Sequence, residues 1–315
     1  MEKIRIGLSR CLLGDNVRYD GGHQQDRYIT DTLGRYFEWV PVCPEVEYGL
    51  PVPREAMRLV GDPASPRLVT VRSGIDHTDG MRRWAEGKLD ELAGEGLLGF
   101  IFKSKSPSSG MAAVKVYTAA GMARKAGVGI FAGAFMARFP QIPCEEDGRL
   151  HDPFLRENFI ERIFVFKRWT DAWHESRSLR TLVDFHSDHK LLIMAHSPAH
   201  LTRLGRLVAN PERRPLQDIA AEYIALLMEG LKPIATARKN TNVLQHMAGY
   251  FKKSLSPGDK EELLGTIGNY HRGMVPLIVP IVLLQHYVRM YDEPYLKRQV
   301  YLHPHPLELM LRNHV

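Results

Sequence analysis

Two cysteines, a glutamate and a run of serines stand out as side chains able to do chemistry. Cys11, Cys43 and Glu45 each lie just beyond a short apolar run, and the serine-rich segment 103–110 follows another. Thiolates bind soft metals and clusters, and a carboxylate with nearby hydroxyls can move protons. The sequence contains no Cys-x-x-Cys pair and no Gly-x-x-x-x-Gly-Lys motif, so neither a zinc ribbon nor a phosphate-binding loop is indicated.

The elements that must position these side chains are strands. The apolar runs at 4–8, 39–42 and 97–102 predict strands, and the last is continuous, as in a buried strand of a parallel sheet. The carboxyl ends of parallel strands lie at one edge, where ligand sites form, so the polar segments are expected to meet there. Taken singly, a cysteine is commonly a small buried hydrophobe and a Ser-Pro pair an ordinary turn.

The remainder of the first half continues this alternation. It predicts an α/β domain with a mainly parallel sheet. The further elements expected are a strand over 68–71, an amphipathic helix over 81–92, a helix over 122–126 that ends at Gly127, and a strand that begins at 128–131.

The second half shows helical periodicity and almost no strand-like alternation. A short acidic turn with a glycine, residues 144–149, separates the two patterns. We therefore predict an α/β domain over residues 1–148 and an all-α domain over residues 149–315. The expected helices span residues 154–169, 179–194, 200–208, 216–231, 241–251, 258–270 and 275–290.

Positive charge is concentrated in the second half. Residues 1–150 have 20 Lys and Arg against 19 Asp and Glu, a net charge of +1, whereas residues 151–315 have 22 against 17, a net charge of +5. This balance is compatible with a polyanionic partner such as a nucleic acid. An ordinary solvated basic surface explains a charge of this size as well.

Composition argues against several protein classes. The longest apolar stretch, residues 275–284, is broken by two prolines and is too short to span a bilayer. Three basic residues within the first ten interrupt any signal-peptide core. Three cysteines are too few, and odd in number, for a disulfide scaffold. We therefore expect a cytoplasmic protein without a membrane partner.

A series of short motifs occurs in order along the first half: Cys11-Leu12-Leu13-Gly14, Val17-Arg18-Tyr19-Asp20-Gly21, Cys43-Pro44-Glu45, Gly49-Leu50, Pro53-Arg54 and Lys105-Ser106-Pro107-Ser108-Ser109-Gly110. Together they closely resemble the TudS family of thiouracil desulfidases, over roughly residues 3–140. The resemblance implies a 4Fe–4S cluster held by three cysteines, with one open iron that has no protein ligand. It makes Cys11 and Cys43 two of these ligands, and Glu45 and Ser106 the catalytic acid/base pair.

The third ligand position departs from the family. The family motif Ser-Pro-Ser-Cys-Gly has its cysteine where this chain has Ser109. A serine hydroxyl binds cluster iron poorly beside thiolates. The surrounding motif residues are intact. We therefore interpret the chain as a variant in which a cluster-ligand cysteine is replaced by serine, and we favour an engineered replacement over a natural homologue that has lost its cluster. Cys144 lies outside these motifs, and we expect it to be structural.

Motifs in the second half, at residues 153–159, 184–186 and 189–190, resemble the helical domain that follows TudS modules in YbgA-like proteins. The fused subgroup, RudS, is associated with sulfur removal from 4-thiouridine in tRNA, so the resemblance implies tRNA as a partner. Four histidines between His186 and His200 form the tightest histidine group. They leave open a metal site, satisfied buried histidines or an RNA-stacking edge.

The site residues suit a desulfuration without electron transfer. A thiocarbonyl sulfur is soft and suits an open iron, while Glu45 can accept a proton from the attacking water and Ser106 can steady the developing charge. Three basic residues flank the site and are expected to hold a substrate phosphate, although surface solubility explains them equally. They are Arg18, Lys103 and Lys105.

We therefore predict an iron–sulfur-dependent enzyme that converts 4-thiouridine to uridine in tRNA. One alternative keeps the enzyme and gives it a small thiolated pyrimidine, free 4-thiouracil or thiouridine monophosphate. Another is a non-catalytic RNA-binding protein whose cluster site has decayed, for which Ser109 is the evidence.

Overall fold

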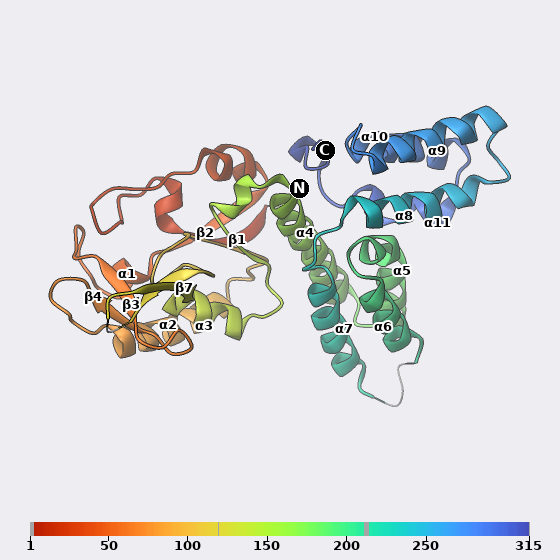
Figure 1. The fold of residues 1–315 in the computed structure, drawn as a ribbon. Coiled ribbons are helices and arrows are strands. Elements are labelled where there is room, and N and C mark those ends of the chain that lie inside the picture. Colours follow the sequence, from red (N-terminus) through yellow and green to blue (C-terminus); the bar gives the residue numbers. More distant parts are fainter. Residues whose placement is uncertain (1–2, 119, 211–213, 315) are drawn as a thin grey trace. The chain divides into compact units, whose positions relative to one another are not determined.

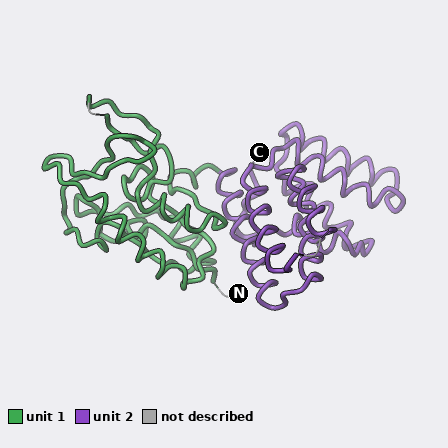
Figure 2. The backbone as a smooth tube through the Cα atoms, turned by 90° about the horizontal axis from the view of Figure 1, so that it is seen from below, with its two compact units in different colours: residues 1–152 green, residues 153–315 purple. Residues whose placement is uncertain are grey.

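The chain divides into two units, each with its own hydrophobic core. A computed structural model describes residues 3–118, 120–210 and 214–314. Unit 1 spans Met1–Asp152 and unit 2 spans Pro153–Val315 (Figure 2). Strands occur in unit 1, and unit 2 is helical (Figure 1).

A parallel sheet of four strands, in the order β2-β1-β5-β8, forms one layer of unit 1. The strand β1 pairs with β2 on one side and with β5 on the other, so the order of strands along the sheet changes direction at β1. Such a switch point opens a crevice at the carboxyl ends of the strands. The strands are β1 (Ile4–Ser9), β2 (Phe37–Val42), β5 (Phe100–Phe102) and β8 (Cys144–Glu146).

Aromatic packing holds helix α3 (Ile130–Arg138) on this sheet. The rings of Phe100 and Phe102 in β5 stack with centroids 4.2 Å apart, and Phe135 of α3 packs against both. On the neighbouring strand, a Cβ at Gly7 would lie 2.2 Å from the Phe100 ring. Position 7 of β1 therefore requires a glycine, because the Phe100 ring lies over it. Helix α2 (Thr78–Ala93) contributes to the same core.

A second sheet, not predicted from the sequence, has the order β4-β3-β6-β7. Its outer pairs are antiparallel and its central pair is parallel, so the expected parallel arrangement describes the first sheet and not this one. The strands are β3 (Met57–Val60), β4 (Arg67–Thr70), β6 (Val114–Tyr117) and β7 (Ala123–Gly127).

Three sequence predictions in unit 1 are wrong. The helix expected over 122–126 is absent: residues 123–126 lie in β7, because pairing with β6 overrides the helix propensity of an Ala-, Arg- and Lys-rich segment. Residues 128–131 lead into α3 rather than forming a strand, because the amides that begin this helix bind the carbonyls of the serine-rich loop. The boundary turn at 144–149 begins with β8, which pairs with β5.

Unit 2 contains helices at all seven expected positions. Hydroxyl side chains cap the N-termini of four of these helices. In each, the hydroxyl accepts a hydrogen bond from the backbone amide three residues later in the chain; the capping residues are Ser178, Ser197, Thr236 and Ser256. The helices are α4 (Pro153–Glu175), α5 (Leu179–His196), α6 (Pro198–Ala209), α7 (Leu216–Gly230), α8 (Ala237–Ala248), α9 (Pro257–His271), α10 (Ile278–Met290) and the short α11 (Pro294–Lys297). In the described part of the chain, no helix combines the length and apolarity needed to cross a bilayer.

Candidate active site

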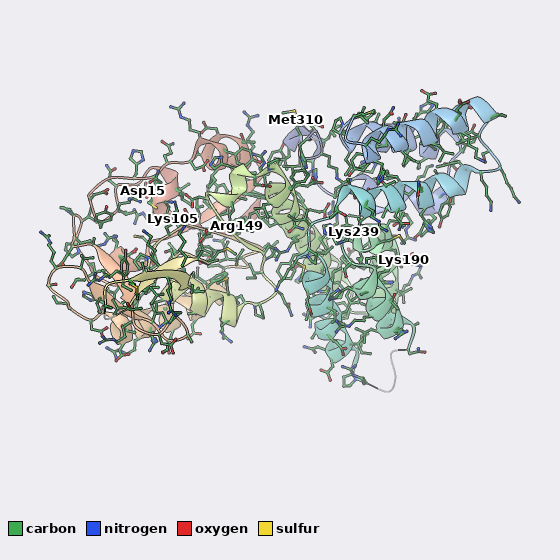
Figure 3. The ribbon with its side chains drawn as sticks, in the orientation of Figure 1. Asp15, Lys105, Arg149, Lys190, Lys239 and Met310 are labelled. Atoms are coloured by element: carbon green, nitrogen blue, oxygen red, sulfur yellow. The ribbon has the colours of Figure 1, made fainter. Side chains whose placement is uncertain are left out.

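All eight residues predicted for the site line one cavity of about 550 Å³ in unit 1. The loops after β1, β2 and β5 contribute them, as expected for the carboxyl edge of a parallel sheet. Figure 3 labels Lys105, on the loop after β5. The eight are Cys11, Arg18, Cys43, Glu45, Lys103, Lys105, Ser106 and Ser109.

The two cysteines are buried where their strands end. Cys11 lies in the turn Arg10–Leu13 after β1, and Cys43 precedes the short helix α1 (Pro44–Glu47) after β2. Burial raises the pKa of Cys11 to about 11. Burial and the nearby carboxylate of Glu45 raise the pKa of Cys43 to about 12. Both side chains are thus neutral thiols at pH 7 unless a bound cation stabilises their thiolates.

The serine-rich loop is held by its own hydrogen bonds. The hydroxyl of Ser106 accepts from the amides of Ser108 (3.3 Å) and Ser109 (3.1 Å), and the amide of Gly110 donates to the carbonyl of Ser106 (2.8 Å). Lys105 enters this turn with φ of 62°, a left-handed conformation. These hydrogen bonds define the turn that carries the serine side chains.

The start of α3 fixes the same loop from behind. The amides of Ile130 and Phe131 donate to the carbonyls of Pro107 (3.2 Å) and Ser108 (2.9 Å). A Cβ at Gly129 would lie 2.5 Å from the backbone of Ser108, so this close approach requires glycine.

Ser108, which sequence reasoning did not single out, connects the proposed acid/base pair. Its fully buried hydroxyl donates to Oε1 of Glu45 at 2.6 Å and lies 2.9 Å from the hydroxyl of Ser106. The Arg54 guanidinium lies 3.7 Å from Oε2 of Glu45 and donates to the carbonyl of Val17. A carboxylate and two hydroxyls thus form one hydrogen-bonded row, in which a proton can move.

The three basic residues differ in what they can offer a ligand. Lys103 forms an ion pair with Asp147 at 2.7 Å, and Asp147 also accepts from the amide of Ser104. Burial would raise the pKa of Asp147, but these hydrogen bonds outweigh burial and lower it. Arg18 lies 3.6 Å from Asp20, and Lys105 is exposed with no ion pair to any residue that the structure describes. Lys105 and Arg18 are therefore better placed than Lys103 to meet a phosphate.

The donor set fits an iron–sulfur cluster at two positions and departs at the third. Two cysteines and Ser109 line the cavity, and the Ser109 hydroxyl lies 3.3 Å from that of Ser108. Cys144 lies in β8, where its thiol contacts the carbonyl of Ile142 at 3.5 Å, and it does not line the cavity. Among the described residues, no three His, Cys, Asp or Glu side chains are grouped to hold a metal ion.

The four histidines from His186 to His200 have separate partners. His186 lies 3.2 Å from the Tyr223 hydroxyl, and His189 is 2.7 Å from the carbonyl of Phe185. Burial lowers the pKa of His186 to about 4 and that of His189 to about 3. His196 contacts Pro233 and Glu161, and His200 contacts Ser197. These contacts favour buried, hydrogen-bonded histidines over a shared metal site.

Two family models match the chain. One, described as 2-thiouracil desulfurase, matches residues 6–147, and the other, described as a protein of unknown function (DUF1722), matches residues 190–306. The first covers the cavity residues of unit 1, and the second lies within unit 2.

Individual proteins also resemble the chain. The uncharacterized protein YbgA of Escherichia coli strain K12 is 33% identical over 158 residues, which is 50% of this chain and 94% of YbgA. A solved structure of a 4Fe–4S-dependent thiouracil desulfidase, TudS, has 33% sequence identity and a TM-score of 0.39, and the match covers 48% of this chain and 95% of that one. The chain belongs to the YbgA family and carries a 2-thiouracil desulfurase domain at residues 6–147.

Proposed function

We propose that unit 1 removes sulfur from a thiolated uracil, replacing C=S by C=O. One observation carries this proposal: the cavity gathers both cysteines and the Glu45–Ser108–Ser106 row within the segment that matches the desulfurase model. Water supplies the oxygen and sulfide leaves, so atoms balance and no electron donor is needed.

The residues of the chain supply acid/base chemistry and positioning. The Glu45 carboxylate accepts a proton from water, and Ser108 and Arg54 hold that carboxylate in place. As charge develops on the pyrimidine, the Ser106 hydroxyl turns its single donated hydrogen bond from the Ser108 hydroxyl to the ring. Exposed Lys105 and half-buried Arg18 are suited to a 5′-phosphate of the substrate.

Cys11 and Cys43 are the residues that would hold an iron–sulfur cluster, with Ser109 at the third position. When bound, such a cluster supplies a soft Lewis acid for the thiocarbonyl sulfur. The Ser109 hydroxyl is a harder and weaker metal ligand than a thiolate. Replacing a cluster-ligand cysteine by serine would leave such a hydroxyl at the third position.

For the full chain, the proposed substrate is 4-thiouridine in tRNA, and the proposed compartment is the cytoplasm. The basic charge of residues 151–315 supports a polyanionic substrate, since Lys and Arg contacts to phosphates dominate nucleic-acid affinity. Free 4-thiouracil or thiouridine monophosphate needs no such surface, so these small substrates are the competing possibility.

Anaerobic reconstitution of the chain and of Ser109→Cys, followed by iron analysis and a thiouracil-to-uracil assay, tests the proposal. We expect about four irons per chain in Ser109→Cys and a labile or substoichiometric cluster in the parent. Desulfuration should follow iron content. Cys144→Ser is the matched control, because Cys144 lies outside the cavity and its loss should leave iron content unchanged.

Full iron occupancy in the parent would show that Ser109 is an adequate ligand. If Ser109→Cys binds iron and tRNA but releases no sulfide from any thiolated pyrimidine, the RNA-binding alternative with a decayed site replaces the enzyme. Ser109 itself is the observation that favours that alternative.

A further inference from the structure

The second sheet of unit 1 buries one face, and the proposed desulfuration does not use the other. The inward side chains, among them Leu59 and Val116, form a core cluster with Met81 of α2. Successive side chains of a strand point to opposite faces, so Val60 and Tyr117, the next residues in β3 and β6, point away from that cluster. We call the face that they share the outer face.

Three basic side chains form a row across the outer face. Val60 of β3 lies opposite Tyr117 of β6 in a parallel register. Two residues earlier in each strand, the same register places Arg58 beside Lys115. Lys115 in turn lies directly opposite Lys125 of the edge strand β7. Neighbouring strands are about 4.8 Å apart, so the row spans about 10 Å.

The positive charge of this row is not balanced. None of its three members forms an ion pair with a residue that the structure describes, whereas Arg67, on the same face, is paired with Asp76 at 3.4 Å. Like charges directly opposite each other destabilise a strand pair, so the two lysines do not serve the packing of the sheet. Lysine on an edge strand can block the addition of a further strand, which explains Lys125 but not Arg58 or Lys115 on the inner strands.

An aromatic ring lies beside the row. The Arg58 guanidinium lies over the half-buried Tyr117 ring, 5.3 Å from its centroid, and Nε of Arg58 has no hydrogen-bond partner. A planar cation held on an aromatic ring offers a flat surface for stacking a base, and the lysines can bind the flanking phosphates. Cations alone would suit any anionic partner. The Arg58–Tyr117 pair favours a nucleotide strand over an acidic protein segment.

Strand β3 joins the outer face to the candidate active site. Glu55, Ala56 and Met57 line the cavity of unit 1, and Arg58 is the next residue in the strand. One residue of a strand advances the chain by about 3.3 Å, so the row begins close to the wall of the cavity.

We propose that the outer face binds a single-stranded segment of RNA. Lys115 and Lys125 contact its phosphates, and one of its bases stacks on the Arg58 guanidinium. The inference rests on the proposed function for the identity of that RNA, because a strand held here can lead a thiolated base toward the cavity. Binding itself requires neither a cluster nor turnover.

Fluorescence anisotropy of a labelled oligouridylate of about ten nucleotides, titrated with the full chain, tests this assignment. At about 50 mM salt we expect Lys115→Gln/Lys125→Gln to weaken binding at least about tenfold. The slope of log K against log salt should become shallower by about 1.4, since each phosphate contact to a single strand contributes about 0.7. The matched control, Arg82→Gln/Arg83→Gln, removes the same charge from exposed positions of α2, on the other side of the sheet, and should bind like the parent.

Two further variants separate RNA contacts from effects on folding. Lys115→Arg/Lys125→Arg keeps both charges and should retain RNA binding. Tyr117→Leu removes the ring that holds the Arg58 guanidinium, and we expect binding to weaken about fivefold or more. Loss of binding in the arginine variant would show that the glutamine variant acts through the structure of the sheet, and the inference would fail.

The inference and the proposed function fail in different ways. Equal affinity and salt slope for the parent and Lys115→Gln/Lys125→Gln would overturn the inference, as would a parent that does not bind the oligouridylate at about 50 mM salt. Turnover of free 4-thiouracil by the Ser109→Cys form should be the same with and without the lysine substitutions. An inactive Ser109→Cys form that still binds RNA through the two lysines would contradict the proposed function and support this surface.

Discussion

At the scale of single residues, the Ser108 hydroxyl links two groups that lie 61 positions apart in the chain, Glu45 and Ser106. The hydroxyl is fully buried, so its hydrogen bond to the Glu45 carboxylate is shielded from water and holds one carboxylate oxygen in a fixed direction. The other oxygen faces Arg54 and the Cys43 thiol, at 3.7 and 3.6 Å. The carboxylate is therefore oriented before any substrate binds.

Glu45→Gln, made in the Ser109→Cys background, tests the role of this carboxylate. We expect desulfuration to fall by about two to four orders of magnitude, because an amide cannot accept a proton from water. Iron content should stay unchanged. The matched control is Glu55→Gln, since Glu55 lines the same cavity but its carboxylate is bound by the amides of Ser73 and Arg72. Equal rates for both variants would remove Glu45 from the reaction.

Sequence reasoning located the residues that share the cavity but not how they pair. Parallel strands place the loops that carry Cys11, Cys43 and Ser106 at one edge, and this follows from strand order alone. The ion pair that neutralises Lys103 could not be foreseen, because Asp147 lies 44 positions away and follows β8, a strand that the sequence suggested as a turn. Ser108 stood within a motif, yet only its side-chain direction reveals its role.

At the scale of elements, α3 supports the serine-rich loop. Gly129→Ala would place a Cβ 2.5 Å from the backbone of Ser108 and force the loop to move. In the Ser109→Cys background we expect this variant to lose most of its iron and activity while unit 1 stays folded by circular dichroism. Gly133→Ala in the same helix is the control, because its Cβ would approach Val128 only to 3.4 Å. If Gly129→Ala retains full iron content, the loop tolerates displacement.

The elements that were mispredicted share a physical cause. The segment that forms β7 is mostly exposed and rich in helix-forming residues, so neither alternation nor propensity marks it as a strand. Its pairing with β6 follows a turn at Gly121, whose φ is 77°. The helices of unit 2 were easier to predict from the sequence, because hydroxyl caps and apolar periodicity are local signals that long-range strand pairing does not override.

At the scale of a whole unit, the carboxyl groups of unit 2 give its stability a distinct pH dependence. Burial raises the pKa of Glu157 to about 7, so its folded form holds a proton that the unfolded chain, with a pKa near 4.5, releases. The contribution of Glu157 to the free energy of unfolding is thus fully present below pH 4.5 and is lost as the pH rises through 7. Glu161, with a pKa of about 2, acts in the opposite sense, and its contribution is lost as the pH falls below 4.5.

Melting temperatures of the parent and of Glu157→Gln, measured from pH 4.5 to 8, isolate the contribution of Glu157 to the pH dependence of stability. His186, His189 and His305 titrate in this range only in the unfolded chain, near pH 6.5, because burial lowers their folded pKa values to about 4, 3 and 4; this effect is common to both proteins and cancels in the difference. We expect the two proteins to melt similarly near pH 4.5 and the parent to lose stability relative to the variant as the pH rises to 8. A difference that is flat with pH would contradict the raised pKa of Glu157.

For the whole molecule, the proposed tRNA substrate requires exposed positive charge that carboxylates do not already neutralise. Arg203 and Arg206 are both exposed on α6, three positions apart, and neither forms an ion pair with a residue that the structure describes. Their helix buries its other face through Leu204 and Val208, so replacing both arginines leaves its packing in place. This pair is therefore suited to a test of phosphate contacts.

The double variant Arg203→Gln/Arg206→Gln should bind tRNA more weakly and with a shallower dependence on salt. Each lost phosphate contact removes a slope of about 0.9 from log K against log salt, so fluorescence anisotropy between about 50 and 200 mM salt resolves the change. Arg298→Gln is the control, because Asp184 and Asp188 already neutralise Arg298. Turnover of free 4-thiouracil by the Ser109→Cys form should be the same with and without the double substitution. If the salt slope does not change, α6 does not contact tRNA, and if tRNA does not bind at all, the small thiolated pyrimidine becomes the substrate.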